Sequence, residues 1–463
     1  KSELALREAE MWGTLAAVSD KGYHYPQQRM DAAWKRLLLN QFHDILPGSS
    51  IGRVYERARE DFQWIQNEGK AVMEEAFSAM TSGEGVTVFN SLSAVRRGLV
   101  VLPERFANGA RTLDGEEIPT QKTDDGILAL VTAPPCGMVS LVPSEAPVSL
   151  RSVCARLTET GAVMENEAVR AVLNRRGEVV SFVDKKTGRE FAASAMNRLL
   201  AYKDIPRTFD AWDIDSNYAE QPVETDEPVS LTLKESGGLR AVLHLERRLL
   251  HSDFSQDIVL EAGSRRLDFV TKVNWKELHC LLKVSFPVAV QAEEGINEIQ
   301  FGYVTRPTIR SRQYDKDRFE VCNQRFSALC DQSHGAAVLN DCKYGVSMNG
   351  NELQLSLLRA AASPEMRADN GEHFFTYAFT AWEGSFGDSP VVEEAYRLNV
   401  PMELAHGSRP TFSAFQLDRE NVWIDTVKPA EDGSGDVIVR LYESKKADTC
   451  CTVKIGLPVQ RVW

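Results

Sequence analysis

The sequence lacks any long apolar segment. None of its apolar runs approaches the roughly 20 residues that span a bilayer, so no membrane partner is expected. It also lacks a basic stripe interleaved with aromatic side chains, and its formal net charge at pH 7 is -13. No nucleic-acid partner is therefore expected, because a phosphate backbone requires a positive surface. A neutral substrate such as a sugar is compatible with this charge.

Cysteines at metal-binding or redox spacing are also missing. The eight cysteines are scattered without a C-x-x-C pair, and no N-x-S/T glycosylation acceptor occurs. Both absences favour a reducing, cytoplasmic setting. The first residue is Lys1 and a helical pattern follows at once, without a targeting segment. We therefore expect the chain to be a truncated portion of a longer protein.

Helical spacing of apolar residues occupies the first part of the chain. At 463 residues, the chain is expected to hold two to four domains. Three helices are predicted before residue 82. The first ends near residues 19–22, the second runs from after Pro26 to about His43, and the third starts at Ser49 or Ser50.

Short β-rich runs bounded by Asn, Gly, Pro and Asp follow, and almost all of the remaining chain has this pattern. The strands are predicted at residues 86–90, 98–102, 138–142, 169–173, 178–183, 230–233, 239–249, 255–260, 267–273, 281–288, 353–358, 374–380 and 437–442. The predicted fold is multi-domain α+β, with an N-terminal three-helix bundle segment followed by mainly antiparallel β-sandwich domains. The predicted domains are a helical bundle at 1–82, a small β domain at 83–148, a large β-sandwich at 149–400 and C-terminal strands at 401–463.

One polar pair stands at the predicted end of the second helix. His43 and Asp44 precede the Pro47-Gly48 break, which would hold the pair in a fixed orientation. A neutral imidazole can bind Zn²⁺ through one ring nitrogen, and a nearby carboxylate can share the metal or a substrate. Alternatively, His43 is a helix-end histidine favoured by the helix dipole, and Asp44 caps the next turn. No second His or Cys stands three or four residues away, so further ligands must come from elsewhere.

A longer string around this pair resembles a known family. LNQFHDILPGSS at residues 39–50 closely resembles the signature of glycoside hydrolase family 38 α-mannosidases, particularly bacterial and cytosolic-type members. Further matches follow in order: VFNSLS at 88–93, GEVVS at 177–181, FDAWDID at 209–215, LNDCKYG at 339–345, LLR at 357–359 and DNGEHFFTY at 369–377. The resemblance covers nearly the whole chain.

The resemblance implies the C-terminal portion of a zinc-dependent retaining α-mannosidase that hydrolyses terminal α-linked mannose. In this family the histidine of the first string is a zinc ligand and the next aspartate lies beside the sugar, which implies these roles for His43 and Asp44. The remaining zinc ligands, the nucleophile and the acid/base belong to an N-terminal catalytic domain that this sequence lacks. The expected partners are that domain and a mannose-containing oligosaccharide or glycoside. This chain alone is expected to be inactive and to contain no catalytic residue.

Three further residues are predicted to bind the substrate. Asp213 lies beside Trp212 in a loop that could contact a sugar, or that is simply a solvated acidic loop. Arg359 follows an apolar strand and could bind hydroxyls or orient an acid, with an edge-strand salt bridge as the alternative. Asp369 precedes an Asn-Gly turn that could approach the same cleft or be a plain turn. The histidines at 24, 244, 251, 279, 334 and 406 are expected to be structural or exposed.

Two other functions fit the same pattern. The chain could be a non-catalytic carbohydrate-binding or scaffolding β-sandwich module, since such folds serve both purposes. Another type of zinc hydrolase is the third hypothesis, although the H-E-x-x-H pattern is absent. A homo-oligomer is compatible with the sequence, which does not determine the oligomeric state.

Overall fold

The computed structural model describes residues 1–225 and 227–463. This part of the chain forms two compact units, and each is assembled from segments that are not consecutive in the sequence. The helical unit consists of Lys1–Phe42, Glu56–Leu150 and Asn399–Trp463. The sandwich unit consists of His43–Tyr55 and Arg151–Leu398.

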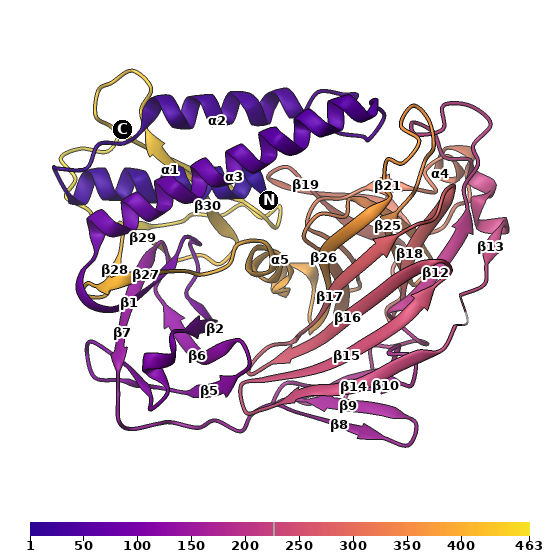
Figure 1. Cartoon of the computed structure of the whole chain (residues 1–463), viewed down its shortest axis with the longest axis horizontal. Helices are drawn as coiled ribbons and strands as arrows, with labels where there is room; N and C mark the ends of the chain where they lie inside the picture. The colour runs from indigo at the N-terminus through magenta and orange to yellow at the C-terminus, as the bar shows by residue number, and fades with distance from the viewer. Residues whose placement is uncertain (226) are drawn as a thin grey trace. The chain divides into compact units, whose positions relative to one another are not determined.

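Three helices open the chain, as the spacing of apolar residues predicted (Figure 1). They are α1 (Ser2–Ser19), α2 (Gln27–Asn40) and α3 (Gly52–Met80). Trp12 of α1 is fully buried, and its ring centroid lies 5.8 Å from that of Phe77 on α3 and 5.1 Å from that of Phe89. These aromatic contacts hold the helices on the first β-strand. Among the described residues, no helix has both the length and the apolar character needed to cross a membrane.

The second helix ends at Asn40, before the predicted end near His43. The amides of Gln41 and Phe42 bond to carbonyls three residues earlier, both at 3.2 Å, so the last turn tightens into 3₁₀ geometry. His43 and Asp44 therefore lie in the turn between α2 and α3 and are not helical.

Within the described residues, antiparallel sheets of six, three, two and two strands complete the helical unit. Their strands are β1 (Ser82–Asn90), β2 (Arg96–Leu102), β3 (Ala110–Thr112), β4 (Glu117–Ile118), β5 (Thr120–Thr123), β6 (Gly126–Ala133), β7 (Gly137–Pro143), β27 (Glu403–Ser408), β28 (Phe412–Ser413), β29 (Phe415–Leu417), β30 (Val422–Pro429), β31 (Val437–Glu443) and β32 (Val453–Ile455). Strand β1 pairs with both β7 and β27, so the C-terminal segment returns to the strand that follows α3. Arg7 of α1 donates to the carbonyl oxygens of Asp425, at 2.6 Å, and Ile424, at 3.1 Å, on β30. The C-terminal strands thus stabilise the first helix.

Next to Arg7, a buried carboxyl makes the helical unit sensitive to pH. Glu8 is 5% exposed, and burial raises its pKa to about 7, although Ser91 Oγ donates to it at 2.7 Å. A carboxyl whose pKa is raised on folding stabilises the folded state fully below its unfolded pKa, and that stability is lost as pH rises through the folded pKa. We expect the helical unit to lose roughly 2 kcal/mol between pH 5 and pH 8 from this group alone. The variant Glu8→Gln, which keeps the bond from Ser91, should flatten this dependence in hydrogen exchange of the α1 amides. An unchanged pH profile in that variant would contradict the assignment.

The sandwich unit is built from antiparallel sheets. The nine-stranded sheet has the order β14-β15-β16-β17-β26-β23-β22-β19-β20, the six-stranded sheet β13-β12-β18-β25-β24-β21, and the four-stranded sheet β11-β10-β9-β8. The strand bounds are β8 Cys154–Thr158, β9 Gly161–Glu165, β10 Val169–Asn174, β11 Val179–Asp184, β12 Arg198–Lys203, β13 Pro222–Val223, β14 Val229–Ser236, β15 Arg240–Leu249, β16 Ser252–Glu261, β17 Arg266–Trp275, β18 Cys280–Pro287, β19 Glu294–Ile299, β20 Gly302–Pro307, β21 Val321–Cys322, β22 Phe326–Cys330, β23 His334–Asn340, β24 Gly345–Asn349, β25 Glu352–Leu358 and β26 Gly371–Glu383. Each predicted run coincides with a strand, apart from differences at the ends, and the predicted fold class is confirmed.

The two larger sheets share one core. Buried and more exposed side chains alternate along β16 and β17, as expected for strands with one face inside. Phe286 on β18 stacks on Phe379 of β26 at 5.7 Å between ring centroids, and Phe269 of β17 lies 5.9 Å from Phe286. Rings from the six-stranded and nine-stranded sheets therefore pack against one another, one pair stacked and the other edge-on.

In the part of the chain that the structure describes, two α-helices lie where the sequence was interpreted as β-rich: the single turn α4 (Gln313–Lys316) and a longer helix near the end of the sandwich unit. Helix α5 (Val391–Asn399) carries Glu393 and Glu394 in its first turn and Arg397 in its last turn. This charge arrangement favours a helix, because it complements the helix dipole. Arg397 also pairs with Glu393 at 2.5 Å, at i,i+4 spacing. The helical signal was present, but the surrounding strand pattern obscured it.

Candidate functional site

The turn that carries His43 and Asp44 is fixed by its own polar groups. Ser50 Oγ donates to the carbonyl oxygen of Asp44 at 2.7 Å, and the Ser50 amide donates to the Tyr55 hydroxyl at 2.7 Å. Gly48 has φ +86°, a left-handed conformation that glycine adopts without strain. The Pro-Gly break predicted from the sequence thus lies within an ordered turn.

His43 is presented to solvent. Its side chain is 68% exposed, and its Nε2 lies 3.5 Å from Oδ2 of Asp44. The ring of Trp212 meets the His43 ring edge-on, with 6.4 Å between centroids, and Trp212 is itself 58% exposed. The structure therefore brings the predicted pair together with the aromatic ring of a loop far along the chain.

The Trp212 loop connects β12 with β13. It turns sharply at Phe209, whose φ is +55° and whose carbonyl oxygen accepts from the amides of Trp212, at 2.7 Å, and Asp213, at 2.8 Å. Asp213 Oδ1 accepts from the amide of the next residue at 2.9 Å, and its side chain is exposed. Asp213, which was predicted to bind substrate, thus follows Trp212 directly on an exposed part of the loop.

A partly buried aspartate ties this loop to the chain beyond β25. Asp210 Oδ2 accepts from the amide of Ala362 at 2.7 Å and lies 3.0 Å from Nε2 of His279. Partial burial acts to raise the pKa of Asp210, but these hydrogen bonds outweigh it, so the pKa lies below its ordinary value. Asp210 is therefore an anchor, held as an anion.

Arg359, another predicted substrate ligand, leaves the end of β25 and points to the same loop. Its Nε donates to Asp204 Oδ2 at 2.6 Å, one terminal nitrogen donates to the carbonyl oxygen of Ala211 at 3.2 Å, and the other donates to that of Asp213. Asp204 is 2% exposed, and burial raises its pKa although Arg359 opposes the shift. All three nitrogens of the guanidinium thus bond to acceptors of the protein itself. Its predicted contact with substrate stays a prediction.

Asp369, the last predicted ligand, supports a neighbouring loop. Its Oδ2 accepts from the amide of Ala360 at 2.7 Å, and its carbonyl oxygen lies 2.6 Å from Nε2 of His373. Glu365 on this loop lies close to the backbone of Gly52, just after the turn that carries His43. A Cβ added to Gly52 would lie only 2.1 Å from Oε2 of Glu365. Asp369 therefore belongs to the same neighbourhood, and its role in binding substrate stays a prediction.

Two residues of this neighbourhood were missed in the sequence. His279 was expected to be structural or exposed, and Asp204 was not singled out. Their partners are 69 residues away for His279 and 155 residues away for Asp204. No local pattern could have indicated either contact, because both depend on strand pairing between distant segments.

The donors fit part of a zinc site. An imidazole nitrogen and a carboxylate oxygen, as His43 and Asp44 offer, are both zinc ligands in proteins. Among the described residues, no group of three or more His, Cys, Asp or Glu side chains is placed to hold a metal ion. A complete site would therefore need ligands from another chain segment.

Exposed apolar side chains stand on the three segments that form this region of the sandwich unit, and we refer to them together as the apolar rim. Leu46 is 70% exposed and Ile51 55% on the His43 segment, while Phe209 is 76% exposed on the Trp212 loop and Met366 74% on the Asp369 loop. Large apolar side chains with more than half of their surface exposed are suited to contacts with another protein segment or a ligand.

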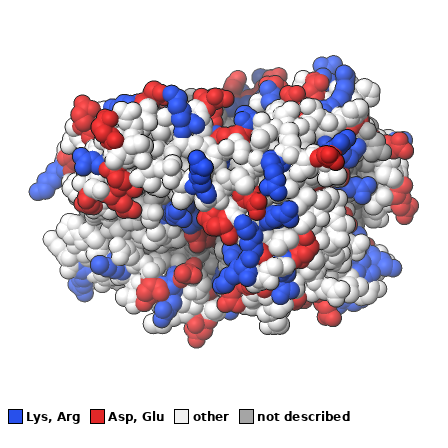
Figure 2. Space-filling model, turned by 90° about the horizontal axis from the view of Figure 1, so that it is seen from below, with Lys and Arg blue, Asp and Glu red and all other residues white. Residues whose placement is uncertain are grey.

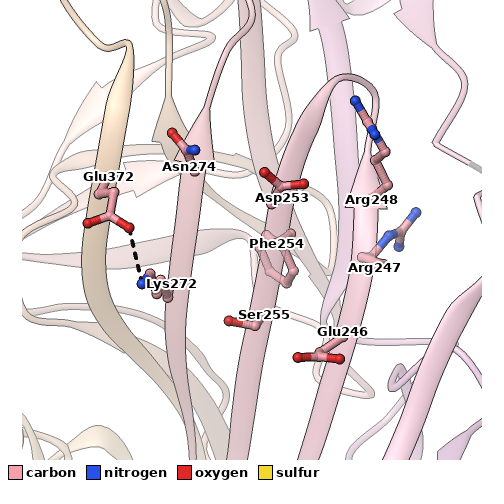
Figure 3. Close-up of a pocket in the computed structure, with 9 residues that line it drawn as sticks. All are labelled: Glu246, Arg247, Arg248, Asp253, Phe254, Ser255, Lys272, Asn274 and Glu372. Atoms are coloured by element: carbon pink, nitrogen blue, oxygen red, sulfur yellow. Dashed lines mark ion pairs between the residues drawn. The ribbon is translucent and has the colours of Figure 1, made fainter.

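A second polar surface lies elsewhere on the nine-stranded sheet. Figure 3 shows a depression lined by β15, β16, β17 and β26, whose residues are Glu246, Arg247, Arg248, Asp253, Phe254, Ser255, Lys272, Asn274 and Glu372. Lys272 pairs with Glu372 across it at 3.1 Å. On the face shown in Figure 2, positive and negative side chains are likewise interspersed. The depression contains none of the predicted site residues.

Comparison with known protein families gives three matches along the chain. Residues 1–80 match the α-mannosidase middle domain, residues 164–367 the glycosyl hydrolases family 38 C-terminal domain, and residues 421–463 the glycosyl hydrolases family 38 C-terminal β-sandwich domain. These matches occur in the order predicted from the sequence motifs.

Curated relatives extend beyond this chain. Human α-mannosidase 2C1 is 34% identical over 99% of the chain, which covers 44% of that relative. Dictyostelium discoideum α-mannosidase G is 31% identical over 96% of the chain, which covers 45% of it. The crystal structure of an α-mannosidase from Enterococcus faecalis V583 has the same fold, with a TM-score of 0.84 at 18% identity, and the match covers 99% of this chain and 63% of that one. The chain thus spans less than half the length of the curated relatives it matches.

Proposed function

Since the chain belongs to glycoside hydrolase family 38, of which it carries the middle and C-terminal domains, we propose that it is the C-terminal portion of a zinc-dependent retaining α-mannosidase. The substrate would carry terminal α-linked mannose, in an oligosaccharide or a glycoside. One observation carries the proposal: the exposed His43-Asp44 pair stands in an ordered turn against the ring of Trp212.

Each of these side chains has a role that its chemistry supports. His43 would hold zinc through one ring nitrogen, and its position at the end of a fixed turn limits the directions from which the metal can be bound. Zinc, when bound, supplies positive charge that orients sugar hydroxyls. Asp44 can accept hydrogen bonds from hydroxyls beside the metal, and Trp212 offers an apolar surface for the sugar ring.

The reaction itself needs groups that this site does not assemble. A retaining glycosidase uses two carboxyl groups roughly 5–5.5 Å apart, one as nucleophile and one as acid/base. Asp44 is the carboxylate beside His43, and we propose that it binds the sugar and is neither of these two groups. We propose that an N-terminal catalytic domain supplies both carboxyl groups and docks over the apolar rim, and that the chain alone is inactive. The cell compartment we propose is the cytoplasm, because all eight cysteines, which lie in the described part of the chain, are free thiols.

The test is His43→Ala in the complete protein. The variant should lose bound zinc and fall at least about a hundredfold in kcat/KM for an aryl α-mannoside, because a metal ligand has been removed. His24→Ala is the matched control, since His24 is also exposed but lies in the helical unit, and it should keep zinc and activity. Metal content by mass spectrometry and the rate of aryl-mannoside cleavage are measured together.

Two outcomes would count against the proposal. Full zinc and full activity in His43→Ala would refute the metal role. If the isolated chain bound mannose in calorimetry without zinc, a carbohydrate-binding module would be the better description, and the polar depression of the nine-stranded sheet would be the surface to mutate first.

A further inference from the structure

One side chain fixes the loop on both sides of Trp212. Arg359 donates to the carbonyl oxygens of Ala211 and Asp213, which are the residues directly before and after Trp212. Its third contact, at 2.6 Å, anchors the guanidinium to the buried carboxylate of Asp204. Three different nitrogens of the planar guanidinium each reach a separate acceptor, which the single nitrogen of an ammonium group cannot do.

Burial does not hold the loop, because its rings are exposed. Phe209 is 76% exposed and Trp212 58% exposed, so neither ring is locked by packing. The polar contacts of Arg359 are supported by a second set, in which Asp210 accepts from Ala362 and the Ala211 amide donates to a carbonyl oxygen at 3.1 Å. The position of Trp212 beside His43 therefore depends on hydrogen bonds to the loop backbone.

We propose that Arg359 is a positioning residue that holds Trp212 beside His43, so that the indole forms the apolar wall of the sugar subsite. The role of the indole as the wall of a sugar subsite rests on the proposed function. The hydrogen bonds by which Arg359 holds the loop, which we call the clamp, lie within this chain alone. An aromatic ring suits the apolar face of a pyranose only when its plane is fixed. Arg359 thus acts on the substrate through Trp212, without touching it.

The discriminating variant is Arg359→Lys. Lysine keeps the charge beside Asp204, so the unfolding midpoint should stay close to that of the unchanged protein, but one ammonium cannot reach both carbonyl oxygens. Amides of residues 205–215 should exchange about tenfold faster in mass spectrometry, because the loop opens more often. In the complete enzyme, KM for an aryl α-mannoside should rise about tenfold, with a smaller change in kcat and unchanged zinc content.

The matched control is Arg207→Lys. Arg207 lies on the same loop, is 89% exposed and pairs with Asp215 at 3.5 Å, so loop exchange and KM should both stay unchanged. Unaltered loop exchange in Arg359→Lys would overturn the clamp. Faster exchange with an unaltered KM would overturn the positioning role. If the unmutated complete protein held no zinc and cleaved no α-mannoside, the proposed function would fail, while loop exchange in this chain would still decide the clamp.

Discussion

Replacing Lys283 with methionine is expected to lower the free energy of unfolding of the sandwich unit by about 3–5 kcal/mol, because a buried carboxylate loses its cation. Lys283 on β18 is fully buried, and its Nζ contacts Glu320, Ser347 Oγ at 2.9 Å and the Tyr218 hydroxyl at 3.2 Å. Tyr218 donates to Glu320 at 2.6 Å. Burial lowers the pKa of Lys283, and Glu320 opposes that shift, so the ammonium depends on this partner.

Two further variants separate lost charge pairing from lost packing. In Lys283→Met with Glu320→Gln, no charge is left buried, so most of the lost stability should return. Lys276→Met removes a lysine that is 42% exposed and pairs with Asp253 at 2.7 Å, and it should cost little. Urea unfolding followed by hydrogen exchange of the β18 amides measures all three. Equal losses in the single and double variants would show that the pair is not the cause.

Replacing Arg266 with methionine is the second change with a large expected effect. Arg266 donates to both carboxylate oxygens of Asp268, at 2.5 and 2.9 Å, and to Glu394 Oε2 of α5 at 2.9 Å. A third acid is close: burial, together with the charge of Asp268, raises the pKa of Glu261 to about 7, while Arg266 opposes the shift. Removing the guanidinium leaves three acids without their shared cation, and we expect a loss of about 3–5 kcal/mol at pH 8.

The loss in Arg266→Met should depend on pH in a stated direction. Without the cation, the pKa values of the remaining carboxyl groups rise further, and a group with a raised pKa loses stability as pH increases. The loss should therefore be clearly smaller at pH 5 than at pH 8. Arg248→Met, at an exposed position on β15, is the control and should show no such trend. A loss that is equal at both pH values would contradict this account of the cluster.

Local patterns were sufficient to predict most of the fold. The helical spacing around Trp12 and the alternation along β16 are both properties of the segment itself, although α1 is buried on every side from Leu6 to Ala16 and β16 on one face. The end of α2 was predicted too late, because the tightening after Asn40 is a matter of hydrogen-bond geometry that composition does not encode. Helix α5 was missed since its nine residues stand among strands.

The candidate site was predictable only in part. Pro47-Gly48 indicated the turn after His43, and the string around this pair resembles the signature of the family. His43 and Trp212 lie in segments that are far apart in the sequence. They meet because the six-stranded sheet of the sandwich unit, which contains β12 and β25, determines where the Trp212 loop lies. For the same reason, the sequence could suggest that Arg359 was important but could not show that its acceptors are loop carbonyls.

The return of the C-terminal strands to α1 and β1 has a consequence for synthesis on the ribosome. The sandwich unit needs no residue beyond Leu398, whereas the helical unit needs Asn399–Trp463 to complete the sheet at β27 and the contacts of Arg7. Chains are made from the N-terminus and domains usually fold as units, so the unit encoded in the middle can fold first. The opening helices can pack on one another and on β1 before then, but the part of their core that Phe415, Ile424 and Val427 close stays uncovered until the last strands emerge. During that interval this unit would be the part of the chain most exposed to aggregation and most dependent on chaperones.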